Sequence, residues 1–149
     1  MIYSGIDLHK TNMVITTIDS NRAELACVKL PCRKAEVSSY FSKFERPHRA
    51  AVESTGSWYW LSDLLTTVGV ELILAHALQL KAISYAKVKT DAVDAGMLAE
   101  LLRVGLMPEA HRISPAMRHL REVMRTRLRL VVRRTAARVQ IHSLAEKAG

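Results

Sequence analysis

The order of the apolar segments constrains the fold of this chain more than any other feature of its sequence. Three short segments rich in β-branched residues come first and predict strands at 2–7, 13–18 and 24–30. After them, segments with the 3–4 apolar spacing of a helix alternate with two short apolar runs. These predict helices at 34–44, 58–68, 77–85 and 91–104, and strands at 49–53 and 70–75.

This order predicts an α/β protein built on one mixed sheet. The first three strands favour an antiparallel meander, whereas strands joined by helices must pair in parallel. We therefore expect a five-stranded sheet with helices on both faces, which is the element order of the ribonuclease H-like fold. Actin-like sugar kinases and ATPases share that order, so it does not decide function by itself.

A long helical segment follows the alternating part. After Pro115 no proline or glycine occurs before Gly149, which predicts a helix too long to bury itself against a compact domain. We predict a catalytic domain over 1–108 and a basic helical segment over 109–149. A narrow apolar seam on this helix predicts coiled-coil pairing, in a homodimer or a higher homo-oligomer, through Leu120, Met124, Leu128 and Val131.

The excess positive charge lies almost entirely in the second part. Residues 1–108 contain 12 Lys and Arg against 11 Asp and Glu, whereas residues 109–149 contain 10 against 3. Such a basic segment indicates a polyanionic partner, most simply DNA or RNA. The side chains expected to contact phosphates are those of Lys10, Lys87, Lys89, Arg118, Arg121, Arg125, Arg129 and Arg133.

Other classes of protein are excluded by composition. No segment approaches the ~20 consecutive apolar residues that span a bilayer, so no membrane partner is expected. The N-terminus carries Asp7 early and has no basic region, unlike a secretory signal. Cys27 and Cys32 are too few for a disulfide framework, and this favours the cytoplasm.

Four acidic residues lie at the ends of predicted elements. Asp7 ends the first strand and Glu53 ends the fourth, and these strands are neighbours in the expected sheet, about 4.8 Å apart. Asp91 and Asp94 begin a helix and, three residues apart, share one of its faces. The four carboxylates are therefore expected to converge on one point.

Converging carboxylates repel one another, and a hard divalent cation with oxygen ligands relieves that repulsion. Asp7, Glu53, Asp91 and Asp94 are accordingly predicted to be both catalytic residues and ligands of Mg²⁺ or Mn²⁺. Two ions would suit the displacement of a phosphodiester. His9 is expected to point to the face opposite Asp7, and the side chains of Trp58, Tyr59 and Trp60 are expected to pack in the core rather than stack on bases.

Three segments of the sequence resemble the signatures of a known family. They are Gly5-Ile-Asp-Leu-His-Lys10, Ala51-Val-Glu-Ser-Thr-Gly56 with Trp58 following, and Lys89-Thr-Asp-Ala-Val-Asp-Ala95. Their order and spacing resemble those of the DEDD-type insertion-sequence transposases of the one-ten family, to which the Piv-type DNA invertases are related. The resemblance covers essentially the whole chain. It implies a RuvC-like domain, similar to the Holliday-junction resolvases, with Asp7, Glu53, Asp91 and Asp94 as its acids.

The resemblance also implies partners. The family binds a structured guide, or bridge, RNA that pairs with donor and target DNA, and a coiled coil follows its RuvC-like domain. Its members continue into a C-terminal domain with a serine implicated as the nucleophile, and this sequence ends before such a region. We therefore expect an N-terminal fragment of a bacterial or archaeal recombinase that does not complete strand exchange alone.

Three alternative functions stay open at this stage. A nuclease of the junction-resolvase type would use the same metal chemistry without a guide RNA. An actin-like nucleotide-binding domain would need a glycine-rich loop after its first aspartate, whereas Leu8-His-Lys-Thr-Asn12 contains no glycine. A non-catalytic RNA-binding and dimerisation module would retain the acids only as vestiges.

Overall fold

The computed structural model describes residues 1–55, 57–83 and 90–149. Within them the chain forms two compact units, Met1–His111 and Arg112–Gly149. The first unit extends slightly beyond residue 108, where the sequence-based prediction ended it. Residues 109 and 110 pair with the last strand of this unit, and the Ala110 amide donates a hydrogen bond to the Leu74 carbonyl over 2.6 Å.

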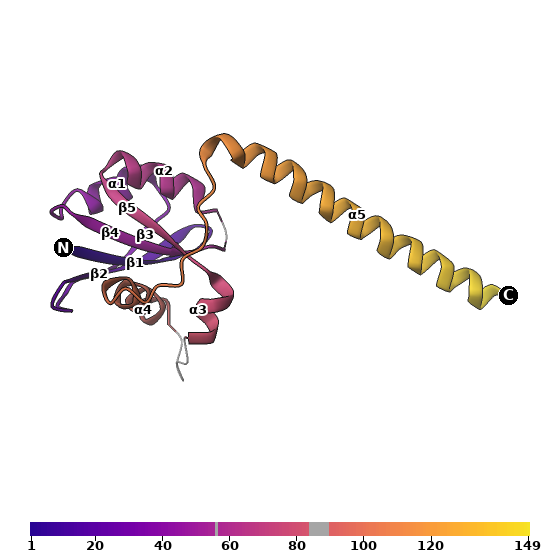
Figure 1. Cartoon of the computed structure of the whole chain (residues 1–149), viewed down its shortest axis with the longest axis horizontal. Coiled ribbons are helices and arrows are strands. Elements are labelled where there is room, and N and C mark those ends of the chain that lie inside the picture. The colour runs from indigo at the N-terminus through magenta and orange to yellow at the C-terminus, as the bar shows by residue number, and fades with distance from the viewer. Residues whose placement is uncertain (56, 84–89) are drawn as a thin grey trace. The chain divides into compact units, whose positions relative to one another are not determined.

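The first unit is built on a five-stranded sheet in the order β3-β2-β1-β4-β5 (Figure 1). Its strands are β1 (Ile2–Leu8), β2 (Asn12–Asp19), β3 (Glu24–Pro31), β4 (His48–Glu53) and β5 (Val70–Ala75). The first three pair antiparallel, whereas β4 pairs in parallel with both β1 and β5. The predicted mixed sheet is thereby confirmed.

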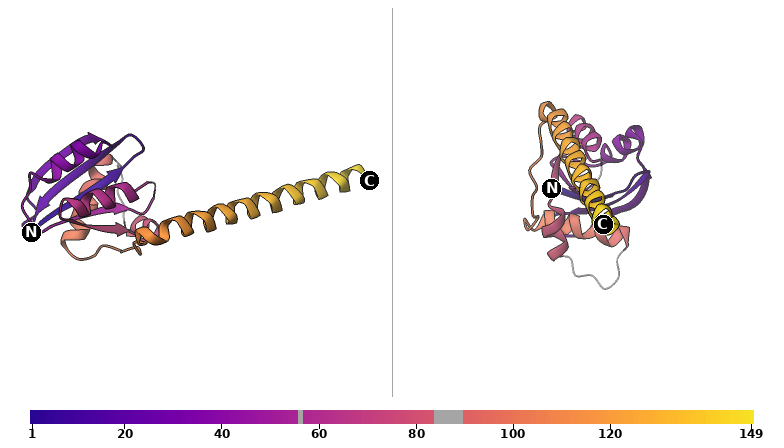
Figure 2. Two further views of the ribbon diagram at one scale, coloured as in Figure 1. Left: turned by 90° about the horizontal axis from the view of Figure 1, so that it is seen from above. Right: turned by 90° about the vertical axis from the view of Figure 1, so that its right-hand side faces the viewer.

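Helices cover both faces of this sheet (Figures 1 and 2). One face carries α1 (Lys34–Phe41) and α2 (Tyr59–Thr67), and the other carries α4 (Asp91–Arg103), while α3 (Ala77–Ile83) follows β5. The predicted stop of the second helix is confirmed, since Gly69 follows its C-cap with a φ of 71°. Residues 84 and 85, the predicted end of the third helix, lie outside the described residues.

Helix α1 is shorter than predicted, because it ends at Phe41 instead of residue 44. The guanidinium of Arg46 donates hydrogen bonds to the main-chain oxygens of Phe41, Phe44 and Val68, over 3.3, 2.7 and 3.2 Å. These bonds stabilise a turn where the apolar spacing alone would continue the helix.

Strand β1 and helix α4 pack closely against each other at Gly5. A Cβ atom placed on Gly5 would lie 1.8 Å from the Ala95 carbonyl oxygen and 2.6 Å from the Ala99 nitrogen. Only glycine permits main chain to pack on main chain at this distance. A cluster of buried apolar side chains from β4, β5, α3 and α4 forms the core on this face of the sheet, among them Ala51, Ile73, Leu80, Leu98 and Leu102.

The opposite face of the sheet encloses a chain of polar groups beneath α1. Ser4 Oγ lies 2.6 Å from Thr17 Oγ1 and 2.8 Å from His48 Nε2, and Thr17 Oγ1 lies 2.6 Å from the Tyr40 hydroxyl. His48 is only 2% exposed. Burial, with a smaller effect of the nearby Arg46 charge, lowers the pKa of His48 to about 4.

The second unit is the single helix α5 (Pro115–Ala148), and none of its 34 residues is buried. Pro115 occupies its first turn after Ser114, as the sequence predicts for a helix start. The predicted apolar seam is open along the helix, with Leu120, Met124 and Leu128 between 51% and 62% exposed. Among the described helices, none combines the length and apolar character that crossing a bilayer requires.

Candidate metal centre

The parallel pairing of β1 and β4 brings Asp7 and Glu53 to the same edge of the sheet. Ile6 lies opposite Val52 in this pair, so Asp7 and Glu53 occupy the next position on each strand. Side chains alternate along a strand, and Asp7 therefore faces the same side as Gly5, the side covered by α4. The sequence-based prediction of this edge depended on the same pairing.

Helix α4 begins beside this edge. The Thr90 hydroxyl accepts a hydrogen bond from the Val93 amide over 3.2 Å, so Thr90 is the N-cap of this helix. Asp91 and Asp94 then lie in the first helical turn. The close contact at Gly5 sets how near this turn comes to β1.

Three of the four predicted acids line one pocket. Asp7, Glu53 and Asp94 share a pocket of about 300 Å³, which we call the acid pocket, with Leu80, Met97 and Leu98 among its apolar walls. Asp91 is not one of its lining residues, but its carboxylate lies within 4.8 Å of ligand atoms of Asp7 and His9. The structure thus brings two acids from the sheet and two from α4 to one region.

Asp7 is the acid most affected by these surroundings. Burial raises its pKa above 3.8, the negative charges of Asp91 and Asp94 add to the rise, and His9 opposes it. A carboxylate destabilised by burial and by like charges gains from a bound cation. The donor set therefore fits a divalent metal ion, with Asp7, Asp91, Asp94 and Glu53 offering oxygens.

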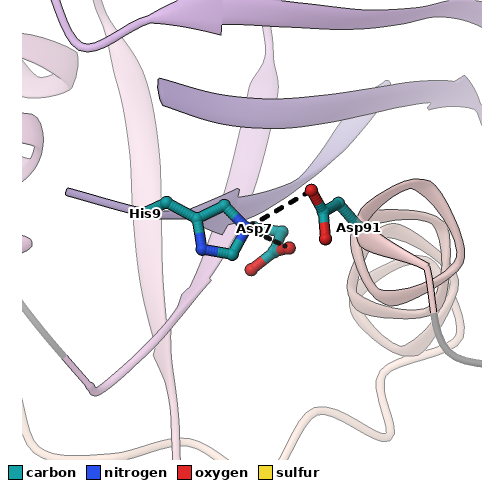
Figure 3. A group of neighbouring side chains, drawn as sticks. All are labelled: Asp7, His9 and Asp91. Carbon is teal, nitrogen blue, oxygen red and sulfur yellow. Dashed lines mark ion pairs between the residues drawn. The ribbon is translucent and has the colours of Figure 1, made fainter. Parts of the chain in front are cut away.

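His9 lies within this group, contrary to prediction. Its Nε2 is 3.1 Å from Asp7 Oδ2 and 3.5 Å from Asp91 Oδ2 (Figure 3). The prediction that His9 faces away was wrong because residues two apart on a strand point to the same face. The two-residue spacing in Asp7-Leu8-His9 contained that signal. In the structure the imidazole nitrogen of His9 lies near one carboxylate from β1 and one from α4.

Lys81 is a second residue that the sequence-based prediction missed. It lines the acid pocket from α3, opposite carboxylates on β1, β4 and α4. A phosphate that enters this pocket would meet three carboxylates and also one ammonium group. No sequence pattern marked Lys81, because its place depends on how α3 packs after β5.

The other predicted contact residues are divided between the two units. Lys10 lies just past β1, beside His9, and its side chain is exposed. Lys87 and Lys89 lie outside the described residues. On α5 the predicted arginines Arg125, Arg129 and Arg133 are exposed, whereas Arg118 and Arg121 are half-buried. The Arg129 guanidinium forms an ion pair with the Glu122 carboxylate, with 4.0 Å between the nitrogen and the oxygen.

The mixed sheet and the helices on its two faces have the RuvC-like, ribonuclease H-like fold. The solved structure "T. thermophilus RuvC in complex with Holliday junction substrate" matches with a TM-score of 0.54 and 16% identity, over 74% of this chain and 99% of that chain. A second one, "Thermus thermophilus RuvC structure", has a TM-score of 0.49 and 17% identity over 74% and 100%. The first of these likenesses shows the fold.

The family follows from a comparison with sequence models of known families. The model of the IS110-type DEDD transposases, described as a transposase, matches residues 4–148. The chain belongs to this transposase family. No curated protein matches the chain.

Proposed function

We propose that the first unit is the metal-dependent catalytic domain of a transposase that cleaves and rejoins DNA phosphodiester bonds. One observation carries this proposal: Asp7, Glu53 and Asp94 line a single pocket, and Asp91 lies beside Asp7. The membership of the chain in a transposase family supports DNA as the substrate. The proposed cofactor is Mg²⁺ or Mn²⁺, with two ions in the site. When bound, these ions would supply charge stabilisation at the phosphodiester.

The residues of the chain have distinct tasks in this scheme. Asp7 and Glu53 offer oxygens from the rigid sheet, whereas Asp91 and Asp94 offer them from the first turn of α4. His9 bridges the two groups, since its Nε2 is near both Asp7 and Asp91. The ammonium of Lys81 orients a phosphate that enters the acid pocket.

The second unit supplies binding in this proposal. The arginines of α5 belong to one helix that buries none of its own residues, and guanidinium groups along such a helix suit contact with a phosphate backbone. The partners we propose are DNA and a structured guide RNA. A second copy of the chain would pair through Leu120, Met124, Leu128 and Val131, and a serine from outside residues 1–149 would act as the nucleophile on DNA.

Calorimetric titration with Mg²⁺ and with Mn²⁺ tests the metal site. We expect saturable binding to the wild-type chain and at least tenfold weaker binding to the double variant Asp91→Asn/Asp94→Asn, because two oxygen ligands lose their charge. The double variant Glu24→Gln/Glu45→Gln is the matched control, since both side chains are exposed. Glu24 pairs with Ile18, and Glu45 precedes His48, which pairs with Ile2, so both lie toward the end of the sheet opposite Asp7.

Two results would contradict the proposal. Equal metal affinity in the wild-type chain and the Asp91/Asp94 variant would place the ion elsewhere. A loss of affinity in the Glu24/Glu45 control as large as in the Asp91/Asp94 variant would show that net charge, and not the cluster, attracts the ion.

A further inference from the structure

A second pocket lies next to the acid pocket and differs from it in chemistry. Leu8, His9, Lys10, Ser57 and Trp60 line a space of about 190 Å³, which we call the Trp60 pocket. Its walls come from the end of β1 and from the start of α2. None of these five residues is acidic, whereas three carboxylates line the acid pocket.

Trp60 differs from its aromatic neighbours in its surroundings. Trp58 is only 4% exposed, and its ring centroid lies 4.5 Å from that of Tyr59 in an edge-to-face contact. The prediction of core packing is therefore confirmed for Trp58. Trp60 is half-buried and contributes to the wall of an open pocket instead. A partly exposed indole in a pocket offers a face on which a flat ring stacks.

The other lining groups select the kind of ring. Lys10 brings a positive charge, and the Ser57 hydroxyl can both donate and accept a hydrogen bond. A space of this volume is smaller than the pockets that hold drug-sized ligands, so it suits one ring system. An aromatic wall next to a cation is the combination that binds bases and phosphates of single-stranded nucleic acids.

His9 connects the two pockets. It lines the Trp60 pocket, and its Nε2 lies 3.1 Å from the Asp7 carboxylate. A nucleotide whose base occupies the Trp60 pocket would therefore have a neighbouring phosphate at the acid cluster.

We propose that the Trp60 pocket is a subsite for one unpaired nucleotide next to the phosphate bound at the acid cluster. The base stacks on Trp60, and Lys10 contacts its phosphate. This inference rests on the proposed function, because it takes the acid cluster to be the place where a DNA phosphate is bound. It adds that the strand is unpaired at that nucleotide.

Tryptophan fluorescence tests the stacking directly, since the chain has two tryptophans. In a Trp58→Phe variant of the full chain, Trp60 is the remaining reporter. We expect tetrathymidylate, added with Ca²⁺, to quench its emission in a saturable way. A tetramer with the same phosphates but abasic sites should leave the emission unchanged, because it has no ring to stack.

Calorimetry with the same tetranucleotide in the Trp58-containing chain gives an independent measure. We expect binding to weaken about tenfold in Trp60→Leu and by less than threefold in Trp60→Phe, which keeps a stacking face. Lys10→Met should weaken binding by a similar factor to Trp60→Leu. Lys43→Met changes an exposed lysine between α1 and β4 that lines neither pocket, and it should have no effect.

Two outcomes overturn the subsite: equal quenching by the abasic tetramer, or wild-type affinity in Trp60→Leu. The metal titration separates this failure from that of the proposed function. Unchanged Mn²⁺ binding in Trp60→Leu, with no loss of tetranucleotide affinity, would refute the subsite alone. Absent metal binding in a chain that still stacks the tetranucleotide would refute the catalytic proposal alone.

Discussion

At the scale of the single residue, His9 decides how the two halves of the metal centre are connected. Its imidazole nitrogen lies within hydrogen-bonding distance of Asp7 and 3.5 Å from Asp91. Nitrogen ligands suit Mn²⁺ better than Mg²⁺, which strongly prefers oxygen. The residue therefore bears on which ion the site prefers.

His9→Ala is expected to weaken Mn²⁺ binding about tenfold and Mg²⁺ binding by less than threefold. Calorimetric titration of both ions measures the difference, with the exposed His111→Ala as the matched control. Equal losses for the two ions would argue that the imidazole only holds the carboxylates and is not itself a ligand.

His48 makes the stability of the first unit depend on pH. Its pKa is about 4 in the folded chain and 6.5 when exposed. Protons therefore bind the unfolded chain first as the pH falls. Stability is full above about pH 6.5 and declines towards pH 4, by about 3 kcal/mol in total.

His48→Gln tests this dependence. The variant should lose most of the decline in unfolding free energy between pH 6.5 and 4.5, whatever its stability at neutral pH. Urea unfolding at a series of pH values gives the slopes. If the variant and the wild-type chain declined in parallel, other groups would be responsible.

The residue scale also shows where prediction from sequence reached its limit. The gathering of the four acids in one region could be predicted, because strand ends and helix starts follow from apolar spacing and because parallel neighbours share an edge. His9 was within reach, since strand alternation places it beside Asp7. Lys81 and Trp60 were not, because their positions depend on how α3 and α2 pack, and no local pattern encodes that.

At the scale of the element, the contact between β1 and α4 affects both the stability of the first unit and the geometry of the acid pocket. Gly5 lies at this contact and Gly96 lies on α4 near β2, and the two glycines differ in what surrounds them. Main-chain atoms block a Cβ at Gly5, whereas a Cβ at Gly96 would meet only the Thr16 methyl group, at 3.9 Å. The two positions form a matched pair.

Gly5→Ala should destabilise the chain by about 3 kcal/mol and weaken Mn²⁺ binding as well, because α4 must move away from β1 and carry Asp91 and Asp94 with it. Gly96→Ala should stabilise by about 0.5–1 kcal/mol, because alanine is the better helix former. Urea unfolding and metal calorimetry on both variants provide the measurement. A Gly5→Ala variant with normal metal affinity would show that the acid pocket tolerates the shift.

Most elements were predicted to within a residue or two, since apolar spacing and β-branched runs reflect which faces are buried. The end of α1 was not. The Arg46 guanidinium donates hydrogen bonds to the Phe41 carbonyl at the end of α1 and to the Val68 carbonyl at the end of α2. These bonds stabilise the turn that ends α1. The bond to Val68 joins residues 22 apart in sequence, so the apolar spacing around α1 contains no trace of it.

At the scale of the whole molecule, the two units are expected to carry separate properties. The proposed metal ligands belong to Met1–His111, and the arginine-rich helix belongs to Arg112–Gly149. Charge removed from α5 should therefore change binding to nucleic acid without changing binding of the metal.

The variant Arg121→Ala/Arg125→Ala/Arg129→Ala tests this separation. A plot of log affinity for single-stranded DNA against log salt concentration should flatten by up to about three units, because fewer counterions are released. Its Mn²⁺ affinity should equal that of the wild-type chain. An unchanged salt slope would mean that α5 does not contact the phosphate backbone.

The contact of Gly5 with α4 also governs how this domain can change over generations. The atoms opposite Gly5 are main-chain atoms of Ala95 and Ala99 together with the Leu98 Cβ, so every other residue meets the same obstacle and no replacement within α4 removes the main-chain part of it. Substitutions outside this contact leave it in place. As long as residue 5 is glycine, α4 can lie at this depth, and with it is kept the spacing between Asp7 and the two aspartates of the helix.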